Sequence, residues 1–170
     1  MTDAIDKLID DVLEREGGFV NHASDRGGPT NWGITQGTLT AWRKQPVSIA
    51  DVQSLTQAEA RKIYRANYFA GLDDVTDPKV LGFLFDYSVN SGPRRAVKAL
   101  QTVIGVPADG SFGPASKAAL AKVKQADLYG PLICERLDFY LRIIANDPSQ
   151  VVFAAGWANR IKPFWERKAA

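Results

Sequence analysis

The most informative stretch of the chain is EGGFVNHASDRGGPTNWGIT, residues 16–35. A helical pattern precedes it, with apolar side chains spaced three and four residues apart between positions 5 and 13, as on the buried face of an amphipathic helix. Gly17 and Gly18 interrupt this pattern, which predicts that Glu16 lies in the last helical turn. The glycines and polar residues that follow predict a loop or a small β-hairpin over residues 18–34.

Helical patterns also dominate the rest of the chain. Thr56 and Glu59 have the spacing of a capping box, which predicts a helix through about residue 69. Asp77 followed by Pro78 predicts the start of a helix that is apolar on nearly all sides over residues 80–90, and such a helix is typically central and buried. Further helices are expected over residues 94–104, 115–124, 131–146 and 149–165. The predicted fold class is therefore mainly α, with a small β-hairpin or loop region near residues 18–34.

The strongest candidate for a domain boundary is Ser91-Gly92-Pro93, where a long apolar helix gives way to glycine and proline. This boundary predicts one domain over residues 1–92 and a second helical domain over residues 93–170 that packs on the first. At 170 residues the chain is long enough for one domain or for two small ones.

Composition excludes several functional classes. Apolar residues make up 45% of the chain, which is too many for a disordered protein. The net charge of +2 is small and no run of Lys or Arg accompanies it, so a nucleic-acid partner is not expected. Cys134 is the single cysteine, so no internal disulfide can form, and no group of residues has metal-ligand spacing. No apolar run approaches the roughly 20 residues of a membrane span. A monomer without metal or cofactor is expected.

Residues 16–35 also hold the groups that glycoside hydrolysis requires. That reaction uses a carboxylic acid to protonate the leaving group and a second group to stabilise the sugar cation or activate water. Glu16 suits the first role, because the negative end of a helix dipole favours a protonated carboxyl group. Asp25 follows nine residues later and could face Glu16, while Thr30 or Thr35 could hold the attacking water.

Simpler structural roles remain open for each of these residues. Asp25 could form only an Asx turn, and Thr35 could be only the N-cap of the next helix. His22, the single histidine, is a candidate substrate-binding residue, although a lone loop histidine is more often structural. A metal site formed by His22 and Asp25 lacks a third ligand.

Several further residues are candidates for binding a polar sugar. Trp32, Tyr64, Tyr68 and Tyr87 could stack on a sugar ring, although aromatic residues at helical spacing are more often part of the core. Asn90 lies one helical turn after Asp86, on the same helix face, and could bind N-acetyl or hydroxyl groups. Asp86 itself could instead anchor neighbouring backbone, because a buried carboxylate must find partners.

The run from Glu16 to Thr35 resembles the signature of glycoside hydrolase family 108, whose members are N-acetylmuramidases found as phage endolysins and bacterial lysozyme-like proteins. The segment FDYSVNSG, residues 85–92, resembles the second conserved block of that family. In the second half, Asp109-Gly110-Ser111-Phe112-Gly113 resembles the Asp-Gly-x-Phe-Gly turn of a peptidoglycan-binding-like domain that accompanies these enzymes. Together these segments extend the resemblance over nearly the whole chain.

The resemblance implies a lysozyme-like fold and cleavage of the β-1,4 bond between N-acetylmuramic acid and N-acetylglucosamine in peptidoglycan glycan strands. It assigns the general acid to Glu16. A looser similarity to phage-type lysozymes, which place an Asp and then a Thr after the catalytic Glu, supports Asp25 and Thr30 as catalytic residues. Phe19 stands where the family has tyrosine, and Ala23 stands where proline often follows the histidine. These departures affect a hydroxyl hydrogen bond and the rigidity of the turn.

Two alternatives to hydrolysis remain open at this stage. A non-catalytic peptidoglycan-binding module could keep a lysozyme scaffold, although it would not need Glu16 and Asp25 together. A lytic transglycosylase also works with one essential glutamate and closes a 1,6-anhydro ring instead of adding water. The N-terminal residues lack the basic and apolar regions of a signal peptide. The protein is therefore expected to be made in the cytoplasm and to act in the periplasm or cell wall after release, without inserting into a membrane.

Overall fold

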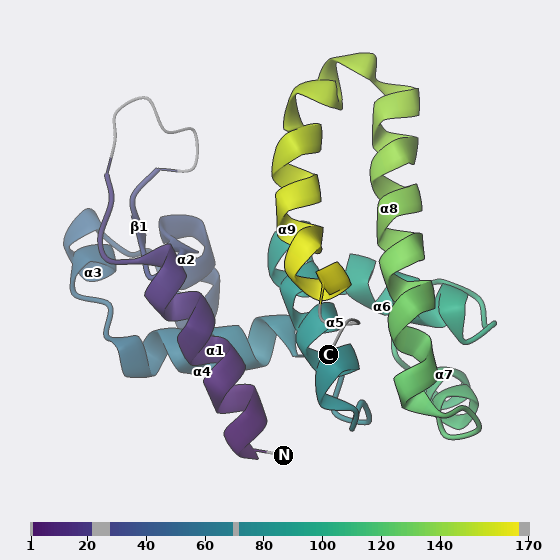
Figure 1. Ribbon diagram of the computed structural model, residues 1–170. Helices are drawn as coiled ribbons and strands as arrows, with labels where there is room; N and C mark the ends of the chain where they lie inside the picture. Colours follow the sequence, from purple (N-terminus) through teal and green to yellow (C-terminus); the bar gives the residue numbers. More distant parts are fainter. Residues whose placement is uncertain (1, 22–27, 70–71, 167–170) are drawn as a thin grey trace. The chain divides into compact units, whose positions relative to one another are not determined.

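The computed structural model describes residues 2–21, 28–69 and 72–166 (Figure 1). The chain divides into two compact units, residues 1–70 and residues 71–170, and each is described by itself. The described elements are almost all helical, with one two-stranded antiparallel sheet. The predicted mainly α, lysozyme-like fold class is confirmed. None of the described helices is long and apolar enough to cross a lipid bilayer.

The described residues of the first unit form four helices and the small sheet. Its elements are α1 (Thr2–Glu16), β1 (Thr30–Asn31), β2 (Ile34–Thr35), α2 (Gln36–Arg43), α3 (Ile49–Gln53) and α4 (Gln57–Tyr68). The strands pair Thr30 with Thr35, and an isolated bridge pairs Val20 with Thr30. Among the described residues, β structure therefore lies in the predicted region 18–34 and at residue 35.

Helix α1 lies against α4 in the first unit (Figure 1). Its side chains Ile9, Val12 and Leu13 are buried with at most 2% of their surface exposed, as the helical periodicity predicts. Two ion pairs fix the register between the helices, from Arg61 to Asp10 and from Arg65 to Asp6. Because these pairs are partly exposed, the buried apolar face contributes more to the stability of this contact than they do.

The start of α4 corrects part of the capping prediction. The Thr56 side chain accepts a hydrogen bond from the backbone N–H of Glu59 (3.2 Å), so the N-cap is confirmed. The Glu59 carboxylate does not complete the box, because it accepts two hydrogen bonds from Arg43 instead (2.8 and 2.9 Å). A full capping box is formed by Ser48 and Asp51 at the start of α3, a short helix that the sequence analysis did not predict.

The Arg43–Glu59 pair predicts a pH dependence of stability for the first unit. Hydrogen bonding from Arg43 holds the pKa of Glu59 below its ordinary value of 4.5. A lowered folded-state pKa means that the stabilisation is present above the unfolded-state pKa and is lost as the pH falls through the folded-state value. Urea denaturation from pH 7 down to pH 3 should therefore show a steeper loss of stability for wild type than for Glu59→Gln. Equal slopes for the two proteins would contradict this role of Glu59.

The second unit consists of helices α5–α9 and two 3₁₀ helices. Its elements are α5 (Pro78–Ser91), α6 (Pro93–Val103), α7 (Pro114–Leu120), η1 (Gln125–Leu128), α8 (Tyr129–Asn146), η2 (Pro148–Phe153) and α9 (Ala154–Glu166). Helices α8 and α9 run side by side, joined through η2 (Figure 1). The helix expected over residues 149–165 is thus two elements. The first element is the 3₁₀ helix Pro148–Phe153, which Asp147 caps by accepting a hydrogen bond from the Ser149 N–H, and the second is α9.

Helix α5 is central and buried, as its apolar sequence predicts. The Asp77 side chain accepts hydrogen bonds from the N–H groups of Lys79 and Val80, so the predicted cap before Pro78 is confirmed. This helix belongs to the second compact unit, whose first residue is 71. The boundary between the two compact units therefore lies before α5, at residues 70 and 71. The domain boundary predicted from Gly92 and Pro93 lies after α5. The predicted division into domains over residues 1–92 and 93–170 remains a prediction.

A buried polar network joins three helices of the second unit. Arg136 of α8 is fully buried and donates to Asp86 of α5 (2.8 Å) and to the Tyr140 hydroxyl (2.9 Å). The same guanidinium and the Tyr140 hydroxyl both donate to the Asn90 side-chain oxygen (3.3 and 2.8 Å). Arg160 of α9 donates to Asp86 from the other side (3.1 Å). Asp86 therefore has the anchoring role that the sequence analysis held open, with side chains as its partners.

The Asp-Gly turn after α6 is held by one buried amide. The Gln101 side-chain nitrogen donates to the Asp109 carboxylate (2.8 Å) and to the Ser111 carbonyl (3.0 Å). Its side-chain oxygen accepts from the N–H of Gly110 (2.8 Å), which has a positive φ of 80°. Through these bonds, the buried Gln101 side chain holds the Asp109-Gly110-Ser111 turn against the end of α6.

Candidate functional site

Glu16 is the last residue of α1 and is exposed to solvent. The helix ends there because Gly17 adopts a left-handed conformation (φ 72°), with its N–H donating to the Leu13 carbonyl (3.2 Å). A β-carbon disfavours that conformation, so glycine at this position decides where the carboxylate leaves the helix. The prediction that Glu16 lies at the end of a helix is confirmed.

The turn of the β1–β2 hairpin has an unusual backbone conformation. Its two loop residues, Trp32 and Gly33, both have positive φ values (53° and 70°), as a type I′ turn requires. Asparagine is preferred at the first of these positions, and a tryptophan there is strained. The Trp32 indole N–H donates to the Leu55 carbonyl (3.1 Å), and this bond helps to hold the residue in place.

A buried asparagine fixes the same hairpin to α3. The Asn31 side-chain nitrogen donates to the carbonyls of Val52 and Gln53 (2.9 and 3.0 Å), at the end of that helix. Asn31 therefore caps the end of α3, although the Val52 carbonyl also accepts a hydrogen bond from the Leu55 N–H (3.2 Å). Side-chain hydrogen bonds from Asn31 and Trp32 thus hold the strained turn, which is an arrangement found where a site must be pre-organised.

Gly33 brings the hairpin close to Glu16 and to α4. A methyl group at Gly33 would lie 2.5 Å from the Tyr64 hydroxyl oxygen and 3.1 Å from Cγ of Glu16. The Tyr64 hydroxyl also donates to the Trp32 carbonyl (3.2 Å). The turn, the carboxylate and α4 therefore meet at a position that has room only for glycine.

Tyr64 and Tyr68 of α4 complete this region. The sequence offered them only as possible sugar-stacking residues, with a role in the core as the alternative. The rings of Tyr64 and Tyr68 have centroids 5.1 Å apart. Burial raises the pKa of Tyr68, and the negative charge of Glu16 raises it further, which places the two side chains near one another. Their spacing of one helical turn was visible in the sequence. That this face of α4 lies toward Glu16 was not, because the two segments are about fifty residues apart.

The two threonines predicted in this region have clear structural roles. Thr30 lies in β1 and forms backbone hydrogen bonds with Val20 (2.8 and 2.9 Å). Thr35 is the N-cap of α2, and its side-chain oxygen accepts from the Thr38 N–H (3.1 Å). The capping role weighed for Thr35 is thus confirmed, while participation of either hydroxyl in catalysis or substrate binding remains a prediction.

Two of the predicted site residues cannot be placed. His22 and Asp25 lie outside the described residues, so their roles stay predictions. The separation between the Glu16 and Asp25 carboxyl groups would distinguish a retaining from an inverting enzyme. Because Asp25 is not described, this distance is not defined by the structure. Within residues 2–21, 28–69 and 72–166, no group of three or more His, Cys, Asp or Glu side chains could hold a metal ion.

Tyr87 and Asn90 both lie on α5, in the second compact unit. The Tyr87 ring has no exposed surface and packs beneath the Arg136 guanidinium, 4.6 Å from the ring centroid. Burial raises the pKa of its phenol. Such a ring is covered by protein, so the predicted stacking on a sugar finds no support in this arrangement. The Asn90 oxygen is already the acceptor for Arg136 and Tyr140, which favours a structural role for it.

Substitution of Gly33 tests the close approach at the turn. Gly33→Ala should destabilise the protein by about 1–3 kcal/mol, because a left-handed alanine is strained and its methyl group would displace the Tyr64 hydroxyl. Gly37→Ala is the matched control, since a methyl group there would meet only the Thr35 hydroxyl at 3.8 Å. Because Gly37 lies inside α2, its replacement by alanine should stabilise the protein slightly. Equal denaturation midpoints for the two variants would contradict this account.

Comparison with known proteins identifies the family of this chain. The model of the family described as glycosyl hydrolase 108 matches residues 9–92, and a model described as a predicted peptidoglycan domain matches residues 95–162. A comparison with curated proteins gave no match. Among solved structures, SagA of Brucella abortus is 37% identical, with a TM-score of 0.80, and the alignment covers 98% of this chain and 94% of that one. Glu16, the hairpin and α4 all fall within the first matched segment, and the chain belongs to glycosyl hydrolase family 108.

Proposed function

We propose that this protein is an N-acetylmuramidase that hydrolyses the β-1,4 bond between N-acetylmuramic acid and N-acetylglucosamine, with Glu16 as general acid. Membership of a glycosyl hydrolase family and the match to a peptidoglycan domain support a glycoside hydrolase that acts on peptidoglycan. The observation that carries the finer assignment is the position of Glu16, an exposed carboxylate at a helix end that packs against Gly33 of a strained turn.

The proposed reaction divides into protonation and water addition. Glu16 gives its proton to the glycosidic oxygen as the bond between that oxygen and the anomeric carbon breaks, which leaves a free hydroxyl on the departing sugar. A water molecule adds its oxygen to the anomeric carbon and loses a proton to a base. Asp25 is the proposed base or charge-stabilising group, and Thr30 is proposed to orient the water.

Trp32, Thr35 and His22 are proposed to contact the glycan near Glu16. Trp32 is half-buried, so part of its ring remains available to a sugar. The strained conformation at this residue supports a functional role, because strain of this kind persists mainly where the surrounding structure holds a site in place. Acting on peptidoglycan would place the working protein in the periplasm or cell wall.

The test is digestion of purified Gram-negative sacculi, with the ends of the soluble products identified by mass spectrometry. A muramidase should release fragments with reducing N-acetylmuramic acid ends. Fragments with 1,6-anhydro ends would instead identify a lytic transglycosylase. Fragments with reducing N-acetylglucosamine ends would contradict the proposed bond, and binding to sacculi without any released fragment would identify a non-catalytic module.

A further inference from the structure

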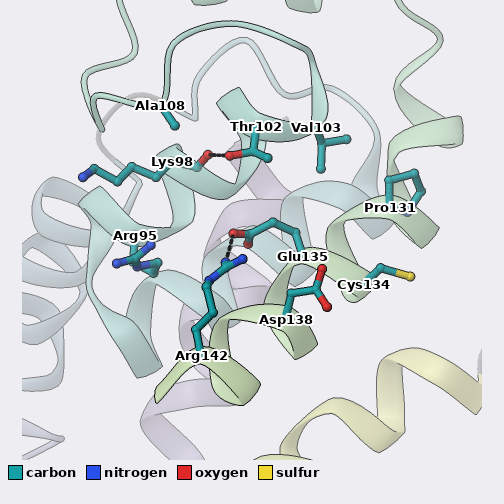
Figure 2. A pocket seen from close by; sticks show the side chains of 10 residues that line it. All are labelled: Arg95, Lys98, Thr102, Val103, Ala108, Pro131, Cys134, Glu135, Asp138 and Arg142. Atoms are coloured by element: carbon teal, nitrogen blue, oxygen red, sulfur yellow. Dashed lines mark hydrogen bonds and ion pairs between the residues drawn. The ribbon is translucent and has the colours of Figure 1, made fainter. Parts of the chain in front are cut away.

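The second unit contains a groove of about 610 Å³ between α6 and α8 (Figure 2). Its size is in the range of small-ligand sites. Arg95 and Lys98 line it from α6, and Glu135, Asp138 and Arg142 line it from α8. The groove therefore brings together three cationic and two acidic side chains, and none of them belongs to the candidate site around Glu16.

Glu135 is the feature that distinguishes this groove from an ordinary surface depression. Its side chain is only 10% exposed. One carboxylate oxygen accepts a hydrogen bond from Arg142 (3.2 Å), while the other, Oε2, is buried and has no hydrogen-bond partner within the described structure. Burial raises the pKa of this carboxyl group, although Arg142 and Arg95 act in the opposite direction. A buried acceptor without a donor is costly and rare. Among the described residues, the Tyr87 hydroxyl is also buried without a hydrogen bond, and the charge of Glu135 raises its pKa, so the candidate donors to this carboxylate are that hydroxyl and a ligand in the groove.

The side chains that line the groove indicate what kind of ligand supplies that donor. Figure 2 shows the Glu135 carboxylate in the middle of the group, with Asp138 one turn further along the same helix. An ammonium group fits two neighbouring carboxylates, and a carboxylate fits Arg95 and Lys98. No aromatic ring is among the described residues that line the groove, so the stacking surface typical of sugar binding is missing there.

We propose that this groove binds the peptide stem of peptidoglycan, through an amino-acid end that carries a free ammonium and a free carboxylate on one carbon. The uncrosslinked side-chain end of a diaminopimelate residue has this chemistry. The ammonium is held between the carboxylates of Glu135 and Asp138, and the carboxylate of the ligand is bound by Arg95 and Lys98. This inference rests on the proposed function for its substrate, but it assigns the recognition of peptide to a different site from the cleavage of glycan.

The test measures binding of the free tripeptide L-Ala-γ-D-Glu-meso-diaminopimelate to the full chain by isothermal titration calorimetry. Glu135→Gln should weaken binding about tenfold or more, because a charge-assisted hydrogen bond is replaced by a neutral one. Lys98→Met should also weaken it, whereas Lys122→Met, at an exposed position outside the groove, should not. Arg142 is 59% exposed, so Glu135→Gln leaves no buried cation without a counter-ion and should not unfold the protein. Urea midpoints of all variants, measured on the same samples, separate weaker binding from unfolding.

Three outcomes would overturn the inference. These are no measurable binding of the tripeptide to wild type, unchanged affinity in both Glu135→Gln and Lys98→Met, and equal affinity for a tripeptide whose side-chain ammonium is acetylated. The two proposals can fail separately. Wild type that binds the tripeptide but releases no sugar fragments would remove the proposed hydrolysis and keep the peptide site. Wild type that releases sugar fragments but does not bind the tripeptide would keep the proposed hydrolysis and remove the peptide site.

Discussion

Glu16→Gln is expected to lower the rate of sacculus digestion by about 10²–10⁴-fold, the usual contribution of a general acid. Glutamine has nearly the same shape as glutamate but has no proton to give to the glycosidic oxygen. Because Glu16 is exposed at the end of α1, the substitution should leave the fold and the denaturation midpoint close to those of wild type. The rate should be measured as release of soluble muropeptides, with circular dichroism recorded on the same samples.

Glu14→Gln is the matched control for this substitution. Glu14 is also exposed on α1, two residues earlier, and the substitution changes the net charge by the same amount. It should retain the activity of wild type. Full activity in a folded Glu16→Gln protein would exclude Glu16 as the general acid, and a similar loss in both variants would indicate an effect of charge on binding to the wall.

The largest effect on stability is expected for Asp86→Asn, at about 3–5 kcal/mol. The side chain of Asp86 is 7% exposed and that of Arg136 is fully buried, so the substitution would leave a guanidinium without its counter-ion inside the protein. Asparagine keeps only one side-chain oxygen, so Arg136 and Arg160 would share a single neutral acceptor. The loss should appear as a lower urea midpoint of the second unit, and Asp127→Asn, at an exposed position of η1, should show almost none.

A double variant separates the charge from the packing. Replacing both partners, as Asp86→Leu with Arg136→Met, removes the unpaired charge together with the ion pair, and it should be less destabilising than Asp86→Asn alone. A double variant that is as unstable as the sum of two single variants would show that Asp86 and Arg136 contribute independently. A midpoint for Asp86→Asn equal to that of wild type would contradict the structural role of the network.

The sequence by itself determined the helices and several of their ends. Periodic apolar residues predicted the buried faces of α1 and α5, and glycine after Glu16 and aspartate before Pro78 predicted where helices end and begin. These signals are local, because a cap or a repeating face depends on residues within one or two turns. The sequence also identified Glu16 as the candidate acid, since its position at a helix end depends only on its neighbours.

Only the tertiary structure decided which distant groups meet. The sequence showed Tyr64 and Tyr68 as a helical pair but did not show that Glu16 and Gly33 lie beside them. Likewise, Glu59 bonds to Arg43 instead of completing its capping box. In each case the side chain could bond to more than one partner, and the local sequence does not decide between them. The partner that it finds is set by the packing of apolar faces, which fixes how segments far apart in the chain approach one another.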